Sequence, residues 1–131
     1  MKAASLSPRV CLVEHEDLLT PEWIAEEVFR LQDADAIFTL NWVCTMLTLR
    51  GLRKLGKTAG REIPLFSFDD FDLADMLTPA LSVVRQPAEM LGREAARLLF
   101  ERLKGRSAKS RSVILHTNLI IRQSCGCKAG S

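Results

Sequence analysis

Long apolar runs are missing from this sequence. No run reaches the roughly 18 to 20 residues that a membrane-spanning helix needs, so we expect no membrane partner. The first ten residues, MKAASLSPRV, also lack the apolar stretch of a secretory signal peptide. Together these two absences predict a cytoplasmic protein.

A strong charge of either sign is absent as well. Eighteen Lys and Arg residues stand against 16 Asp and Glu residues, which gives a formal net charge of +2. Nucleic-acid-binding domains carry clustered positive charge, and a surplus this small does not indicate such a cluster. We therefore expect that this chain itself contacts neither DNA nor RNA.

Cysteine and histidine are scarce, which limits catalytic and metal chemistry. The chain has two histidines, and neither stands in a recognisable catalytic motif. Of the four cysteines, Cys11 and Cys44 lie in apolar runs, and we expect both to be small core residues. Cys125 and Cys127 are expected in an unstructured tail, and two thiolates without a nearby histidine do not make a zinc site. We predict no metal and no cofactor.

The chain does have enough apolar residues to bury a core. Its 131 residues are 47% hydrophobic and 26% charged, which describes one folded domain. We expect a disordered amino terminus at residues 1–8, one folded unit at residues 9–124 and a carboxyl-terminal tail at residues 125–131.

Apolar runs of strand length alternate with amphipathic stretches of helix length. This alternation is typical of an α/β fold in which helices flank a mostly parallel sheet. The continuous hydrophobicity of residues 36–40 predicts a strand that is buried on both faces. The other predicted strands are residues 10–13, 63–68, 81–85 and one or two segments within 113–121, broken near 117–118. The predicted helices are residues 21–32, 42–57 and 87–104.

Polar side chains follow the predicted strands. Ligands of open parallel α/β sheets bind beyond the carboxyl ends of the strands. Carboxylates and amides hold hydroxyl groups, and an aromatic face covers the apolar side of a sugar ring. The set therefore favours a cleft for a sugar or a nucleoside. Its members are Asn41, Trp42, Asp69, Asp70, Arg85 and Gln86.

Other interpretations of these residues stay open. Asn41 is also a suitable cap for the helix that starts at Trp42, and Asp69 with Asp70 is a common turn signal. The two aspartates also suit a divalent metal or phosphoryl transfer. That chemistry needs a hydroxyl group and a lysine at later strand ends, where this chain has Arg-Gln-Pro. We therefore predict that the chain is not an enzyme.

Four spaced segments occur in a distinctive order along the chain. They are residues 35–41 (DAIFTLN), 52–56 (LRKLG), 66–70 (FSFDD) and 77–96 (LTPALSVVRQPAEMLGREAA). Together they resemble the effector-binding region of bacterial LacI/GalR-type transcriptional regulators, over about residues 9–124. The resemblance implies the C-terminal lobe of a periplasmic-binding-protein-like (type I) fold.

The resemblance also implies which residues bind a ligand. Asn41 and Asp69 match positions that hold sugar hydroxyls in the family, and Gln86 matches a residue at the cleft and hinge. Leu18 lies near the place where many members have an aromatic side chain. Trp42, which comes from the strand-end residues above and not from the resemblance, completes the set of ligand residues that we predict.

Two positions depart from the family pattern. Trp42 follows the strand-end asparagine where the family usually has aspartate. Ser67 precedes the aromatic-Asp-Asp motif where the family usually has glycine.

Family members combine an amino-terminal helix-turn-helix with two α/β lobes, and this sequence corresponds to the second lobe. The helix of residues 87–104 crosses to the other lobe in relatives, so we expect its apolar stripe to be exposed here and to favour association. The implied function is the sensing of a sugar or related metabolite by a homodimer that contacts operator DNA only through the missing amino-terminal domain. The alternative is a truncated interaction or dimerisation module without ligand function.

Overall fold

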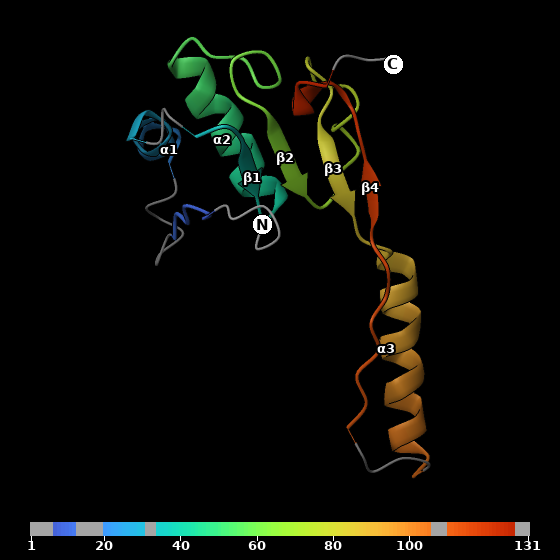
Figure 1. The fold of residues 1–131 in the computed structure, drawn as a ribbon. Helices are drawn as coiled ribbons and strands as arrows, with labels where there is room; N and C mark the ends of the chain where they lie inside the picture. The colour runs from blue at the N-terminus through green and yellow to red at the C-terminus, as the bar shows by residue number, and fades with distance from the viewer. Residues whose placement is uncertain (1–6, 13–19, 31–33, 106–109, 128–131) are drawn as a thin grey trace.

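A four-stranded sheet forms the centre of the molecule (Figure 1). The computed structural model describes residues 7–12, 20–30, 34–105 and 110–127. Three neighbouring strands run parallel, and the last strand pairs antiparallel to the third. The strands, in their order across the sheet, are β1 (Ile37–Thr39), β2 (Leu65–Phe68), β3 (Ser82–Arg85) and β4 (Asn118–Ile120). The predicted α/β fold with a mostly parallel sheet is confirmed.

Helices α1 (Pro21–Arg30) and α2 (Trp42–Lys54) pack against each other, and α2 lies against β1 and β2. The hydroxyl of Thr20 caps α1, because it accepts a hydrogen bond from the Trp23 backbone N–H at 3.1 Å. Gly51 allows the close approach of the two helices. A Cβ atom at this position would lie 2.8 Å from the Ile24 side chain and 3.1 Å from the Ala25 backbone nitrogen.

The core lies between this helix pair and the sheet. Its side chains are aliphatic, and they come from α1, α2, β2, β3 and the loops before β2 and between β2 and β3. Burial of this apolar surface is the main favourable term in the stability of the fold. The buried core residues are Val28, Leu52, Ala59, Ile63, Leu65, Ala74, Leu81 and Val83.

The predicted strand at residues 10–13 is wrong for the three residues that the structure describes. Val10 and Leu12 are 70% and 79% exposed, and no strand includes them. Residue 13 lies outside the described residues. An apolar run forms a buried strand only where a neighbouring strand and a covering helix accept it, and here the sheet begins at β1. Cys11 is therefore exposed rather than part of a core.

Burial of β1 on both faces is also wrong. Thr39 is buried, whereas Phe38 and the following Leu40 are exposed. Successive side chains of a strand point to opposite faces of the sheet, and β1 is buried on one face only.

Helix α3 (Ala88–Leu103) projects away from the sheet (Figure 1). The structure describes all of this helix, and none of its residues is buried. The sequence predicts the helix within one residue at each end. Side-chain ion pairs within the helix join Arg93 to Glu89 at 2.5 Å, and Arg97 to Glu94 and Glu101 at 2.7 and 2.6 Å. The expected exposure of its apolar stripe is confirmed, with Leu103 at 72%.

The chain stays ordered beyond the predicted end of the fold. A 3₁₀ turn, η3 (Gln123–Cys125), follows β4 and buries Ser124 completely. The Ser124 hydroxyl donates to the Leu65 carbonyl at 2.7 Å and accepts from the Ser82 N–H at 2.8 Å. The expectation of an unstructured tail is therefore wrong for Cys125, which is buried next to this anchor. Among the described residues, no helix combines the length and apolar character needed to cross a membrane.

Candidate ligand-binding site

The carboxyl ends of the three parallel strands meet at one edge of the sheet. In Figure 1 the arrowheads of β2 and β3 point to the end from which α3 projects. Asn41, Asp69 and Gln86 follow β1, β2 and β3 within two residues of each strand's end. The topology therefore places these three predicted ligand residues along the same edge.

Asn41 has a structural task at this edge. Its Oδ1 accepts a hydrogen bond from the Cys44 backbone N–H at 2.8 Å, which caps α2. The cap interpretation of this residue is thus correct. The cap uses the side-chain oxygen only, so the Nδ2 amide of this exposed residue is chemically able to donate to a ligand.

Asp69 and Gln86 are brought into contact by the fold. The Gln86 side-chain amide donates to Asp69 Oδ1, and the Asp69 backbone N–H donates to the Val84 carbonyl at 3.0 Å. Asp69 has a φ of 77°, in the left-handed region that non-glycine residues rarely adopt. Such a conformation persists only where surrounding contacts hold it, and it is common at binding sites.

Asp70, next in the chain, forms a cluster with two arginines. Its Oδ2 accepts from Arg85 Nε at 2.8 Å, and Arg122 reaches both of its carboxylate oxygens at 3.3 Å. Arg122 also donates to the Leu81 carbonyl at 2.7 Å. The side chains of Asp70 and Arg122 are only 10% and 16% exposed.

The two arginines set the protonation of Asp70. Burial by itself would raise the pKa of this carboxyl group, but the hydrogen bonds and positive charges of Arg122 and Arg85 lower the pKa below its ordinary value. Asp70 is therefore an ionised partner for guanidinium groups. Sequence reasoning missed Arg122, because it lies 52 residues away from Asp70 and meets it only through the pairing of β4 with β3.

This arrangement argues against metal or phosphoryl-transfer chemistry at Asp69 and Asp70. Both carboxylate oxygens of Asp70 already accept hydrogen bonds from cations, and Asp69 accepts one from an amide. Across the described ranges, no group of three or more His, Cys, Asp and Glu side chains gathers as metal ligands would.

The remaining predicted site residues are less informative. Trp42 opens α2 next to Asn41, and its side chain is 56% exposed at the same edge. An exposed indole can cover the apolar face of a sugar ring. Leu18 lies outside the described residues.

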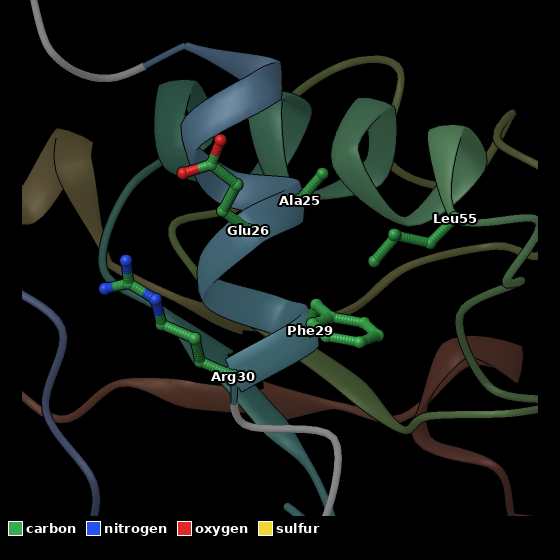
Figure 2. A pocket seen from close by; sticks show the side chains of 5 residues that line it. All are labelled: Ala25, Glu26, Phe29, Arg30 and Leu55. Atoms are coloured by element: carbon green, nitrogen blue, oxygen red, sulfur yellow. The ribbon is translucent and has the colours of Figure 1, made fainter.

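The surface of the described part of the chain has a polar and an apolar hollow. A polar hollow of about 420 Å³ adjoins the Asp70 cluster, and it is lined by Asp70, Phe71, Asp72, Asp75, Arg85 and Arg122. An apolar hollow of about 360 Å³ lies between α1 and the end of α2, where the Phe29 ring faces Leu55 (Figure 2). Of the predicted ligand residues, Asp70 and Arg85 line the polar hollow, whereas Asn41, Trp42, Asp69 and Gln86 line neither.

A mostly parallel α/β sheet with amide, carboxylate and indole groups along its carboxyl edge is typical of one lobe of a small-molecule-binding domain. The comparisons with known proteins agree. Residues 2–125 match the periplasmic binding protein-like domain, and the chain belongs to this family in the form found in LacI-type transcriptional regulators.

Three relatives illustrate the match. The HTH-type transcriptional regulator CelR of Thermobifida fusca is 31% identical over 125 residues, which cover 93% of this chain and 37% of that protein. The crystal structure of a regulatory protein of the LacI family from Chloroflexus aggregans has a TM-score of 0.75 and 30% identity, with 95% of this chain and 46% of that chain covered. The CelR–cellobiose complex has a TM-score of 0.71 and 31% identity, with 80% and 33% covered.

These relatives are transcriptional regulators and not enzymes, as predicted. The chain spans little more than a third of the length of CelR.

Proposed function

We propose that this chain is the part of a LacI-type regulator that senses a sugar or a related small metabolite. The observation that carries the proposal is the hydrogen-bonded pair Asp69–Gln86 beside Asn41 at the carboxyl edge of the sheet. The similarity to CelR, whose structure contains cellobiose, supports a sugar as the ligand class.

The proposed residues suit this chemistry. The Asp69 carboxylate accepts hydrogen bonds from sugar hydroxyls, while the amides of Asn41 and Gln86 both donate and accept. Trp42 covers the apolar face of the ring, and Leu18 remains a predicted ligand residue. The fixed pairing of Asp69 with Gln86 keeps the carboxylate in place before the ligand arrives, which lowers the entropic cost of binding.

In the whole regulator, the ligand shifts the equilibrium between conformations of two lobes and so changes the affinity of a homodimer for operator DNA. DNA is contacted by an amino-terminal domain that this sequence does not include. Because operator DNA lies in the bacterial cytoplasm, the proposal places the protein there.

The proposal is tested by calorimetric titration of the chain with cellobiose, lactose and ribose, with its melting temperature measured alongside. A sugar that binds the folded state must raise its stability. We expect saturable binding that Asp69→Ala abolishes. Asn41→Ser is the matched variant for the cap, because serine also caps helices. We expect Asn41→Ser to keep the wild-type melting temperature and to lower the affinity for the sugar. Asn41→Ala lowers both the melting temperature and the affinity.

Two results would contradict the proposal. Chains that bind none of the sugars, or a wild-type affinity that survives Asp69→Ala, would remove the sugar site from this edge. The competing function is then a dimerisation module without ligand function. The observation that favours it is the helix α3, which has no buried residue. A dimer that forms equally well with and without sugar would support it.

A further inference from the structure

Three buried hydroxyl side chains lie together near the carboxyl ends of β1 and β2. We call Thr39, Thr45 and Ser67 the hydroxyl cluster. Thr45 Oγ1 lies 2.7 Å from Thr39 Oγ1 and 2.7 Å from Ser67 Oγ. Thr45 and Ser67 are fully buried, and Thr39 is nearly so. The cluster thus links β1, α2 and β2 where they reach the carboxyl edge.

The cluster reaches the backbone of two of the proposed ligand residues, Asn41 and Asp69. Thr45 Oγ1 is 2.7 Å from the Asn41 carbonyl oxygen. Ser67 Oγ is 3.1 Å from the Phe68 carbonyl oxygen and 3.4 Å from that of Asp69. Thr39 Oγ1 is 3.2 Å from the Phe66 carbonyl oxygen. A chain of hydroxyl groups therefore runs from Asn41 to Asp69.

Each hydroxyl carries one proton, so these contacts compete. If Thr45 donates to the Asn41 carbonyl, Ser67 must donate to Thr45 to keep their mutual bond, and it no longer donates to the backbone beside Asp69. If Ser67 instead donates to the Phe68 or Asp69 carbonyl, the bond between Thr45 and Ser67 persists only if Thr45 donates to Ser67. The Asn41 carbonyl then loses its hydrogen bond from Thr45. The carbonyls of Asn41 and Asp69 thus draw on the same protons. Displacement of one strand end changes the hydrogen bonds of the other.

We propose that the hydroxyl cluster positions Asn41 relative to Asp69 and thereby determines which sugar the site accepts. This inference rests on the proposed function for its ligand. The residues of the cluster are positioning residues, because they act through the backbone of the two ligand residues.

The test compares Thr45→Val, which removes the hydroxyl at nearly equal volume, with Thr45→Ser, which keeps it. Thr48→Val is the matched control, because Thr48 is a buried threonine one turn further along α2 and outside the cluster. The first readout needs no ligand. In ¹⁵N-resolved NMR spectra, the Asp69 backbone amide and the Gln86 side-chain amide report the position of the Asp69–Gln86 pair.

We expect Thr45→Val to shift the Asp69 and Gln86 signals together with the Cys44 amide that reports the Asn41 cap. In Thr45→Ser and in Thr48→Val, these signals stay at their wild-type positions. The second readout is the affinity for cellobiose and for lactose, two sugars that differ at one hydroxyl. Thr45→Val weakens binding about five- to tenfold, since one hydrogen-bonded hydroxyl is lost, and changes the ratio of the two affinities.

Asp69 and Gln86 signals that stay unmoved in Thr45→Val, or that move equally in Thr48→Val, would overturn the inference. An unchanged ratio of sugar affinities in a Thr45→Val chain that still binds would do the same. If the wild-type chain binds neither sugar, the proposed function fails at this edge. The NMR shifts alone then decide whether the cluster couples Asn41 to Asp69.

Discussion

Asp70 shows how a single side chain organises the region next to the proposed site. Its carboxylate accepts hydrogen bonds from the guanidinium groups of Arg85, at the end of β3, and Arg122, after β4. Hydrogen bonds to charged groups are stronger than neutral ones, and a buried charge left without its partner is costly. The Asp70 side chain therefore connects the end of β2 to β3 and to the segment that follows β4.

We expect Asp70→Asn to lower the free energy of unfolding by about 2 kcal/mol, because it removes the charge that Arg85 and Arg122 face. Urea unfolding measures this loss. Asp72→Asn is the control, since Asp72 is an exposed aspartate in the same loop, and it should cost well under 1 kcal/mol. Equal losses in the two variants would show that the arginine contacts add nothing.

The pKa of Asp70 also makes stability depend on pH. Its folded pKa lies below the ordinary value near 3.8, so the unfolded chain binds this proton first. The contribution is complete well above that value and is lost as the pH falls through it toward the folded pKa. We expect unfolding curves recorded between pH 7 and pH 3 to show a shallower acid loss for Asp70→Asn than for wild type. Parallel curves would contradict this.

The strand-end residues could be predicted from the sequence, but their neighbours could not. Asn41, Asp69 and Gln86 follow apolar runs, and the chemistry of parallel sheets places such residues at one edge. The hydroxyl cluster and Arg122 depend on contacts between residues far apart in the chain. Serine, threonine and arginine are common on surfaces, so their burial carries no local signal.

At the scale of whole elements, local signals predict the helices well. Thr20 and Asn41 are capping residues at the starts of α1 and α2, and Gly56 and Gly105 follow the ends of α2 and α3 with positive φ. The strands β2 and β3 fall inside predicted apolar runs. Residues 10–12 fail as a strand because strand formation needs a partner that the local sequence does not specify.

The sequence did not predict the turn η3, because this turn also depends on contacts with distant parts of the chain. It is held by Ser124 bonds to β2 and β3, and its fit depends on a glycine in another loop. Gly60 has a φ of 76°, and a Cβ atom there would lie 2.5 Å from the Gln123 carbonyl oxygen. The close approach of these two backbones requires the absence of a side chain.

We expect Gly60→Ala to lower the free energy of unfolding by more than about 2 kcal/mol, from the left-handed conformation and the clash together. Gly56→Ala is the matched control. Gly56 also has a positive φ, but nothing lies within 4 Å of its Cβ position. That variant should cost about 1 kcal/mol, as thermal or urea unfolding would show. Equal costs would mean that η3 moves aside freely.

On the scale of the whole molecule, helix α3 is the feature that most needs a partner. It projects from the sheet (Figure 1), and none of its residues is buried. Exposed apolar patches of this kind mark interaction surfaces or lead to association. The exposed apolar side chains of α3 are Met90, Leu91, Leu99, Phe100 and Leu103.

We expect the chain to self-associate as its concentration rises, with α3 as the contact. Leu99→Lys combined with Leu103→Lys should reduce association at least tenfold, because two charges would have to be buried. Glu89→Gln on the same helix is the control and should leave it unchanged. Sedimentation velocity at several concentrations measures the effect. Association that persists in the double variant would place the contact elsewhere.

The central claim is that a sugar binds at the carboxyl edge of the sheet, and an NMR titration of the ¹⁵N-labelled chain with cellobiose tests it most directly. The account predicts saturable shifts at Asn41, Asp69 and Gln86 that are absent in Asp69→Ala. Shifts confined to the apolar hollow around Phe29 and Leu55, or a spectrum that no tested sugar changes, would contradict it.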